Sequence, residues 1–432
     1  MAVRRKLILF VVLIMATSFN PIALETAVVP DFLLVPENVR LTNSYSSSDD
    51  FIAAEKNITS LMRKWSLTGA SIAVAVDGKL VYAKGFGVVD TVSNIEVQPY
   101  NRFRIASISK LITAAAIMKL VEDGKLSLED KVFGPLAILN DQYFNNPKDR
   151  RVYNITVEDL LTHKGGWSQR YGDHMFMPVT IAERMGVRPP ANTKTIVRYA
   201  LDRNLHFTPG KGSSYSNLGY GILGLVIEKV SGMSYESYCR KEILEPIGIF
   251  DMQLGNNLQT DKAPYEVSYY TPSDILLKPS VYGTGELLNP SNGGNDIEAL
   301  GGAGAWIATA PDLMRLLLAL DGFDNFPDIL APESIAYMSS QVNGEGAIGW
   351  TSTSGNGTWT RTGSFPGTLG MMRRLPDGTA WVALFNSSSW NGPMAQSYVS
   401  SAMSRFIRQF KELPATDLYE YYIPVPLMAD SN

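Results

Sequence analysis

The predicted strands of this chain lie near its two ends, and helix and loop patterns fill the sequence between them. Near the start, residues 70–76 and 79–85 are rich in strand-forming residues and are joined by Asp77-Gly78, a pair typical of a tight hairpin turn. Further strand patterns follow near the end, at residues 357–362, 368–375 and 379–386. We therefore expect both ends to build one sheet, with a helical insert between them and a cleft where sheet and insert meet.

These patterns predict an α+β fold: an antiparallel β-sheet flanked by N- and C-terminal helices, with a large, mainly helical inserted lobe. The flanking helices are predicted over residues 49–66, where apolar residues recur at helical spacing, and over residues 394–413. The sheet lobe is expected to comprise residues 49–104 and 345–413. The helical lobe is expected to comprise residues 105–344.

The two ends of the chain are predicted to lie outside this domain of residues 49–413. Arg4-Arg5-Lys6 and the apolar run after it are typical of a secretory signal peptide over residues 1–23, or of a short anchor if it stays uncleaved. Residues 24–48 are predicted as a linker, and residues 414–432 as a tail that is either a surface strap or disordered. The expected location is secreted or extracytoplasmic, with membrane contact only through an uncleaved N-terminal segment.

Composition excludes several classes of ligand. The chain has 38 Lys and Arg against 42 Asp and Glu, without long basic runs, which gives no electrostatic reason to expect nucleic acid. Small molecules and short peptides remain as candidate substrates. Cys239 is the only cysteine, so there is no intrachain disulfide and no Cys-rich metal site. Glycosylation sequons would agree with export, and they lie at Asn57, Asn154, Asn356 and Asn386.

A helix with a serine at its mouth is predicted from Ser107 to Glu122, with Gly124 as its stop. Ser107 and Lys110 are three residues apart, and this spacing puts both side chains on one helix face. The amine would then be close enough to take the hydroxyl proton, which is the chemistry of a Ser-Lys nucleophile. The alternative is an ordinary core helix with a capping serine and a solvated lysine.

Two later segments offer groups that such a nucleophile needs. Tyr215 and Asn217 share a short loop before the apolar helix predicted over residues 222–230, so a phenol and an amide could face one cleft. Arg361-Thr362-Gly363-Ser364 ends a predicted strand, where backbone N–H groups could point at a substrate carbonyl. A plain β-turn is the alternative there.

In chain order, the S-x-x-K at Ser107, the Y-x-N at Tyr215 and the basic-[ST]-G at Arg361 resemble the motifs of the serine β-lactamase and penicillin-binding-protein superfamily. The resemblance is strongest to its class C β-lactamase, D,D-carboxypeptidase and esterase-like branch. It runs from about Asp49 to Leu413. It implies a serine hydrolase that cleaves an ester or amide through an acyl-enzyme and needs no metal or organic cofactor.

The resemblance also implies a role for each motif residue. Ser107 becomes the nucleophile, Lys110 the base that keeps it reactive, and Tyr215 the proton shuttle. Asn217 would hydrogen-bond the substrate amide or Lys110.

The third motif is implied to bind substrate. The backbone N–H groups of Ser107 and Ser364 would form the oxyanion hole, with Thr362 and Gly363 beside them. The family pattern usually has Lys or His at the position of Arg361. Arg can clamp a substrate carboxylate, but unlike Lys or His it cannot exchange a proton. This departure puts turnover of β-lactams and peptides in question. It also keeps a rival open, a catalytically weak family member that binds peptides or assembles with itself.

Other residues near these motifs have weaker signals. His163 follows a Leu-Leu-Thr context of the same family, and its predicted role is structural. Trp167 and Tyr171 follow the Gly165-Gly166 loop and are candidates for the cleft wall.

Overall fold

A computed structural model of the chain describes residues 40–340, 347–388, 392–410 and 414–421. All of them belong to one compact unit. The predicted signal peptide or anchor, residues 1–23, lies outside the described residues. None of the helices described is both long and apolar enough to span a membrane.

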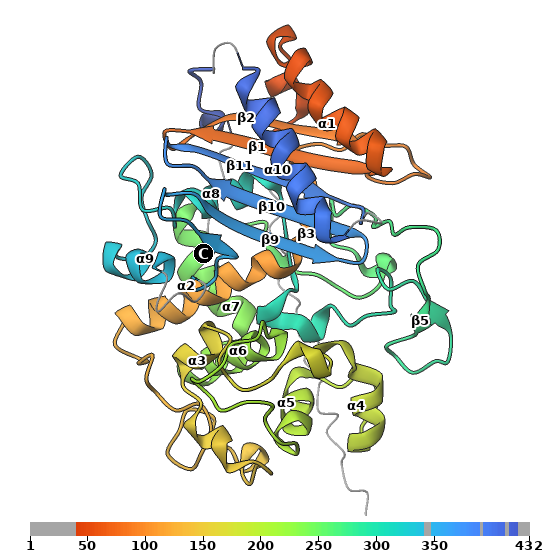
Figure 1. Ribbon diagram of the computed structural model, residues 1–432. Helices are drawn as coiled ribbons and strands as arrows, with labels where there is room; N and C mark the ends of the chain where they lie inside the picture. Colours follow the sequence, from red (N-terminus) through yellow and green to blue (C-terminus); the bar gives the residue numbers. More distant parts are fainter. Residues whose placement is uncertain (1–39, 341–346, 389–391, 411–413, 422–432) are drawn as a thin grey trace, which may run out of the picture. The chain divides into compact units, whose positions relative to one another are not determined.

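Strands from both ends of the chain form one antiparallel sheet of six strands in the order β2-β1-β11-β10-β9-β8 (Figure 1). The strands are β1 (Gly69–Val76), β2 (Lys79–Gly87), β8 (Ser352–Thr353), β9 (Trp359–Phe365), β10 (Thr368–Arg374) and β11 (Thr379–Phe385). Strand β1 pairs directly with β11, and Ala70 lies opposite Phe385. The prediction that the two ends build one sheet is therefore confirmed.

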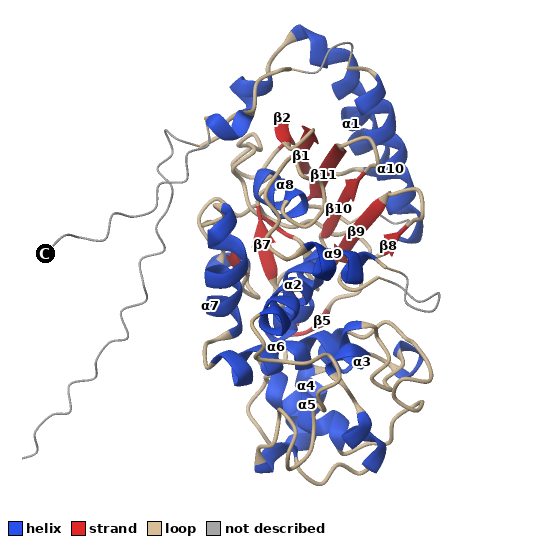
Figure 2. Ribbon diagram, turned by 90° about the vertical axis from the view of Figure 1, so that its left-hand side faces the viewer, coloured by secondary structure: helices blue, strands red, loops and turns tan. Residues whose placement is uncertain are grey.

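Helices cover both faces of this sheet. On one face lie α1 (Ile52–Trp65) and α10 (Gly392–Arg408), and on the other lies α8 (Ala310–Leu318) (Figure 2). Helix α2 (Ser109–Glu122) packs mainly against α6 (Asn217–Ser231) and other helical segments. Every residue of β11 is buried, because that strand is covered on both sides. Helix α8 packs on β11 and β1, so it belongs with the sheet although it falls inside the lobe predicted over residues 105–344. Its residues are buried throughout, which suits this inner position.

Most of the remaining helices form the inserted lobe below the sheet in Figure 1. The other described α-helices are α3 (Val157–Leu161), α4 (Pro178–Met185), α5 (Thr193–Leu201), α6 (Asn217–Ser231), α7 (Tyr235–Cys239) and α9 (Pro332–Ser339). Short strands join them in two small sheets, β3 (Phe103–Arg104) with β7 (Trp306–Ala308) and β4 (Gln253–Leu254), and β5 (Lys278–Pro279) with β6 (Leu287–Leu288). Helix α6 begins at Asn217, earlier than predicted, because the Ser216 hydroxyl accepts a hydrogen bond from the Gly219 N–H and caps it.

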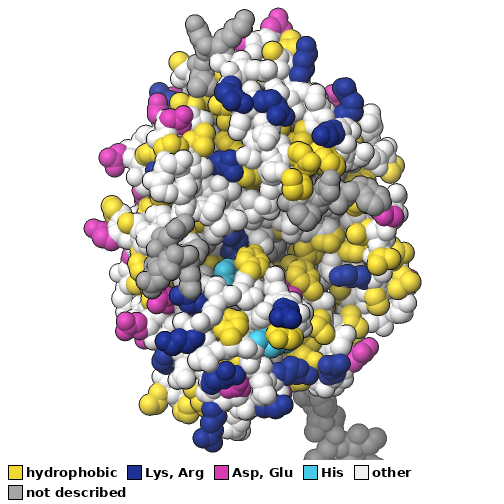
Figure 3. Space-filling model, viewed as in Figure 1, with side chains coloured by type: hydrophobic (Ala, Val, Ile, Leu, Met, Phe, Trp, Pro, Cys, Tyr) yellow, Lys and Arg dark blue, Asp and Glu magenta, His cyan; other side chains and the backbone are white. Residues whose placement is uncertain are grey.

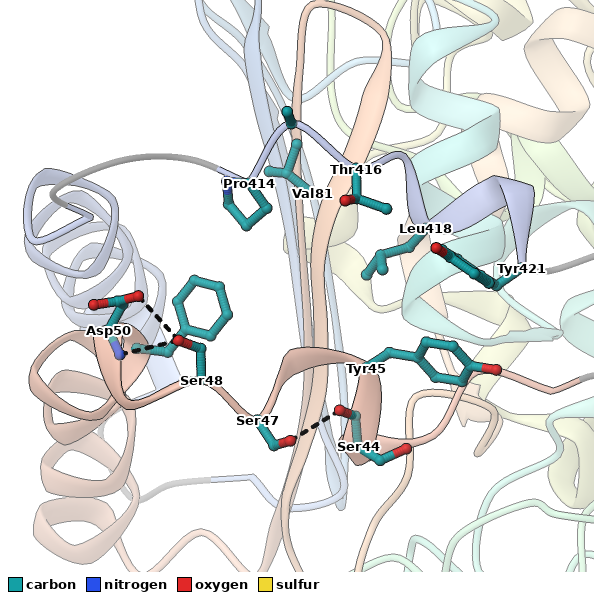
Figure 4. Close-up of a pocket in the computed structure, with 12 residues that line it drawn as sticks. Ser44, Tyr45, Ser47, Ser48, Asp50, Val81, Pro414, Thr416, Leu418 and Tyr421 are labelled. Atoms are coloured by element: carbon teal, nitrogen blue, oxygen red, sulfur yellow. Dashed lines mark hydrogen bonds between the residues drawn. The ribbon is translucent and has the colours of Figure 1, made fainter.

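The outer edge of the sheet, strand β2, is covered by the two ends of the described chain. The N–H groups of Leu80, Ala83 and Gly85 donate in turn to the side chains of Asp417, Ser46 and Asn43. Such capping protects an edge strand from pairing with another chain. Tyr45 and Tyr421 also stack, with ring centroids 5.3 Å apart, beside a cavity of about 830 Å³ between the two segments (Figure 4). Residues 40–48 thus belong to the sheet edge rather than to the linker predicted over 24–48, and residues 414–421 form a strap.

The sequons differ in their accessibility. Asn154 and Asn356 are exposed and Asn57 is half-buried. Asn386 is fully buried, where its amide oxygen accepts from the Gly69 N–H and its amide nitrogen donates to the Val88 carbonyl. A glycan therefore cannot attach to Asn386 in the folded chain.

Candidate active site

Ser107 lies in a single 3-10 turn, Ala106–Ile108, that runs directly into α2. It therefore stands just before the helix rather than on it. Ala106 has a φ of 47°, a left-handed conformation that strains any residue except glycine. Strained turns of this kind gather at functional sites. The turn leaves Ser107 half-exposed while its neighbours are buried.

The Ser107 hydroxyl opens into a cavity of about 420 Å³. Its walls come from the helical lobe and from β9, and the face drawn in Figure 3 is hollowed between the sheet and the helices below it. The lining residues are Ser107, Thr162, His163, Ser213, Tyr215, Ala347, Trp350, Thr351, Arg361, Thr362, Gly363, Ser364 and Gln396. Trp167 and Tyr171 are not among them: Trp167 is buried, and Tyr171 stacks on His206 with ring centroids 4.4 Å apart.

Lys110 is fully buried beneath Ser107. Its Nζ lies 3.3 Å from the Ser107 Oγ, 2.7 Å from the Asn217 Oδ1 and 2.5 Å from the Ala303 carbonyl oxygen. The solvated lysine of the alternative interpretation is therefore excluded. All polar contacts of this amine are made inside the site.

Tyr215 approaches Ser107 from the other side, and its hydroxyl donates to the Ser107 Oγ over 2.7 Å. Burial raises the pKa of this phenol, but the positive charges of Lys110 and Arg361 outweigh that effect and lower the pKa to about 8. Burial also lowers the pKa of the Lys110 amine, and Arg361 lowers it further while Tyr215 opposes the shift. The pKa values of both groups beside Ser107 are thus lowered from their ordinary values, as is common for groups that exchange protons in active sites.

Asn217 links Lys110 to a residue that no motif predicted. Its Oδ1 accepts from Lys110, and its Nδ2 donates to the Asp173 Oδ2 over 2.7 Å. Of the two contacts implied for Asn217, the structure shows the one to Lys110. Asp173 has no sequence signal beyond being an acidic residue in a loop, and such a signal fixes no distance to Ser107.

Gly363 brings β9 into backbone contact with the turn that holds Ser107. A Cβ at this position would lie 2.1 Å from the Ile105 carbonyl oxygen and 3.0 Å from the Ser107 nitrogen. Only glycine fits without a shift of one backbone away from the other.

Ser364 presents its N–H group to the open edge of β9. The Thr362 N–H points away from β10 and donates to the Thr351 Oγ1 over 3.0 Å. Because successive residues of a strand face opposite ways, the N–H of Ser364 lies on the same side as that of Thr362. Ser364 and Ser107 line the same cavity, as the implied oxyanion hole requires.

Arg361 contacts the backbone of Ser107. Its Nε donates to the Ser107 carbonyl oxygen over 2.8 Å, its Nη2 donates to the same oxygen, and the side chain is 2% exposed. This geometry favours a clamp on the Ser107 turn over the expected anchor for a substrate carboxylate.

Replacing Arg361 with alanine is expected to lower kcat/KM for a neutral ester by about tenfold or more, because the Ser107 turn loses its clamp. The Arg361 charge lowers the pKa of Tyr215, so its removal should raise that pKa. The pH profile of the alanine variant should therefore shift to higher pH. Arg361→Lys keeps the positive charge but cannot donate two hydrogen bonds to the Ser107 carbonyl oxygen in the same way. Its pH profile should therefore stay near that of the parent, and its kcat/KM should lie between those of the parent and Arg361→Ala. If Arg361→Ala hydrolyses the ester as fast as the parent, the contact of Arg361 with the Ser107 turn does not contribute to activity.

His163 supports Tyr215 from behind. Its ring lies 4.7 Å from the Tyr215 ring and 5.2 Å from the Tyr220 ring, and its Nδ1 accepts from the Ser216 N–H. Burial and nearby positive charge lower the pKa of His163 to about 3, so the ring is neutral at physiological pH. These contacts agree with the structural role predicted for His163.

Comparisons with known proteins agree with this fold. The family model described as Beta-lactamase matches residues 54–399. Protein flp of Staphylococcus aureus (strain N315) is 30% identical over 244 residues, which are 56% of this chain and 45% of flp, so the chain spans less than half of that relative. The octameric penicillin-binding protein homologue from Pyrococcus abyssi is 28% identical, with a TM-score of 0.61 over 84% of this chain and 79% of that one.

A D-amino acid amidase from Ochrobactrum anthropi SV3 has the same fold, with a TM-score of 0.64 at 21% identity over 84% of this chain and 99% of that one. The family match covers both lobes and all the motif residues between Ser107 and Ser364. The chain therefore belongs to the beta-lactamase family.

Proposed function

We propose that this protein is a serine hydrolase that cleaves an ester or amide through an acyl-enzyme on Ser107. The observation that carries the proposal is the position of the Ser107 hydroxyl between two proton-exchanging groups. The Tyr215 hydroxyl lies 2.7 Å from the Ser107 Oγ and the Lys110 Nζ lies 3.3 Å from it, at the mouth of a cavity large enough for a small substrate.

The proposed reaction has two halves. In the first, the Ser107 Oγ attacks the substrate carbonyl carbon, its proton passes to the Lys110 amine, and Tyr215 gives a proton to the departing alcohol or amine. The N–H groups of Ser107 and Ser364 bind the oxyanion that forms. In the second, water attacks the acyl carbon and gives its proton to Tyr215, and Lys110 returns its proton to the Ser107 Oγ as the carboxylic acid leaves.

The cavity lining narrows the class of substrate. Hydroxyl groups, Gln396 and Trp350 form much of it, and among the described residues the lining holds Arg361 but no carboxylate. Neutral or mildly anionic acyl compounds suit these walls. The similar amidase was crystallised with L-phenylalanine amide, which makes amino-acid amides candidate substrates here. Esterase-like or peptidase-like action is favoured over dedicated β-lactam hydrolysis.

A hydrolysis screen tests the reaction class. Activated esters, amino-acid amides of both configurations, D-amino-acid peptides and β-lactams are offered to the parent protein and to Ser107→Ala. We expect turnover of at least one class that Ser107→Ala lacks. If the two proteins are indistinguishable on every class, the enzyme proposal is wrong and the rival of a catalytically weak binding protein replaces it.

Activity is expected to depend on pH through Lys110 and Tyr215. Below a pH of about 8 this pair holds an additional proton, so no free base faces Ser107, and kcat/KM for an ester that does not ionise should fall as pH decreases. The midpoint should lie well below about 10, where free lysine and tyrosine titrate. A rate profile measured at constant folded fraction checks this, and a flat profile across neutral pH would contradict it.

Export remains part of the proposal because residues 1–23 have the pattern of a signal peptide. N-terminal sequencing of the protein recovered outside the cell should find these residues removed. Retention of the intact chain in the cytoplasm would overturn it.

A further inference from the structure

A continuous chain of short polar contacts runs from a loop carboxylate to the nucleophile. The Asp173 Oδ2 accepts from the Asn217 Nδ2 over 2.7 Å, and the Asn217 Oδ1 accepts from the Lys110 Nζ over 2.7 Å. The Lys110 Nζ in turn lies 3.3 Å from the Ser107 Oγ. Three separate segments of the chain, the loop before residue 174, α6 and α2, are joined by these contacts.

The contact with Asp173 fixes which end of the Asn217 amide faces Lys110. An ionised carboxylate only accepts hydrogen bonds, so the NH₂ group of Asn217 must point toward Asp173. The amide oxygen then necessarily points toward Lys110. We propose that Asp173 is a positioning residue that orients the base Lys110 through Asn217, an inference that rests on the proposed hydrolase function.

This orientation matters because a neutral lysine amine has two N–H donors and one lone pair. The Asn217 Oδ1 and the Ala303 carbonyl oxygen accept the two donors, at 2.7 Å and 2.5 Å. The lone pair is left for the hydroxyl groups of Ser107 and Tyr215, which also lie against the amine, and in the proposed reaction it takes the Ser107 proton. If the Asn217 amide turned over, its NH₂ group would compete with Ser107 for that lone pair.

Asp173 also contributes charge to the site. Its carboxylate forms no ion pair with any residue in the described part of the chain. The titratable or charged groups that act on Lys110 or face it are Tyr215, Tyr220, His163, Arg361 and Asp173. Burial and Arg361 lower the pKa of Lys110, whereas Asp173 raises it and so limits the shift.

A purely structural role accounts for only one of the two oxygens of the Asp173 carboxylate. Its Oδ1 accepts from the Met175 N–H over 3.0 Å and caps the short 3-10 turn of residues 174–176. The Oδ2 is not needed for that cap and instead binds Asn217. Asparagine caps helical turns as well as aspartate does, so Asp173→Asn retains the cap while removing the charge and the obligatory acceptor.

The test compares the parent with Asp173→Asn on a neutral activated ester over a range of pH. We expect kcat to fall by about 10- to 100-fold with KM within about twofold, because the base is misoriented while substrate binding is untouched. The acid limb of the profile should also move to lower pH, since loss of the carboxylate lowers the pKa of Lys110. Asp173→Ser keeps a capping oxygen but is too short to reach Asn217. It should show the same fall in kcat as Asp173→Asn, and this agreement would show that the effect of Asp173→Asn is not a folding defect.

A double-mutant cycle shows whether Asp173 acts through Asn217. In an Asn217→Ala background, Asp173→Asn should have little further effect on kcat. The matched control is Asp141→Asn, which removes an equal charge from an exposed ion pair with Lys229 and should leave the profile unchanged.

Several outcomes would overturn the inference while the hydrolase proposal stands. The first is a rate and a pH profile of Asp173→Asn that match the parent's, and the second is a raised KM with unchanged kcat. The third is a double variant whose loss of kcat equals the product of the losses in Asp173→Asn and Asn217→Ala. If the parent itself neither hydrolyses the ester nor becomes acylated on Ser107, the proposed function fails, and the inference falls with it.

Discussion

Replacing Lys110 with methionine is expected to lower kcat/KM for a neutral activated ester by about 10³-fold, the range that a positioned general base contributes. Methionine is unbranched and apolar, so it can occupy the buried channel of Lys110 without adding volume. The Ser107 hydroxyl then keeps Tyr215 but loses the amine that takes its proton. Stability should change little, because the loss of hydrogen bonds to Asn217 and Ala303 is offset by removal of a buried amine. Ester hydrolysis and thermal unfolding, measured on the same samples, check both parts.

Lys119→Met provides the matched control for this experiment. Lys119 lies on the same helix, α2, but its side chain is 28% exposed and pairs with Asp123. Its replacement should leave hydrolysis unchanged. A Lys110→Met variant that retains more than about a tenth of the parent's activity would remove lysine from the proposed base role.

The second large effect is expected for Gly363→Ala. The added Cβ would lie 2.1 Å from the Ile105 carbonyl oxygen, so β9 and the Ser107 turn must separate. The forced separation should destabilise the fold by about 1–3 kcal/mol. It should also lower kcat/KM by about 10²-fold, since a shift of about 1 Å between Ser107 and the N–H of Ser364 disrupts the site. Urea unfolding and ester kinetics measure the two effects separately.

Gly355→Ala is the control for that substitution. Gly355 precedes the same strand, and a Cβ there would meet no atom within 4 Å. This variant should be parent-like in both measurements. If Gly363→Ala is parent-like too, the close approach of β9 to the Ser107 turn does not constrain the site.

The sequence predicted the sheet and the main site residues because their signals are local. Strand patterns, the Asp77-Gly78 turn and the order of motifs can all be read from neighbouring residues. The motif residues Ser107, Lys110, Tyr215 and Asn217 do meet in space.

Other features depend on contacts between distant segments, for which no local pattern exists. Asp173 reaches Asn217 only through the path of its loop, and no spacing rule encodes that path. Arg361 turned out to bind the Ser107 carbonyl, because the pairing of β9 aims its side chain at the turn rather than at solvent. Residues 40–48 look irregular by sequence, yet they are held in place because N–H groups on the outer edge of β2 donate hydrogen bonds to their side chains.

The proposed function requires that Ser107 be acylated, and intact-protein mass spectrometry detects that acyl group. The parent protein and Ser107→Ala are each mixed with an activated ester or a fluorescent penicillin, quenched within seconds and weighed. We expect the parent to gain the mass of one acyl group, located by peptide mapping on Ser107, and Ser107→Ala to gain none. An adduct of equal size on Ser107→Ala, or turnover of the ester by that variant at the parent's rate, would contradict it.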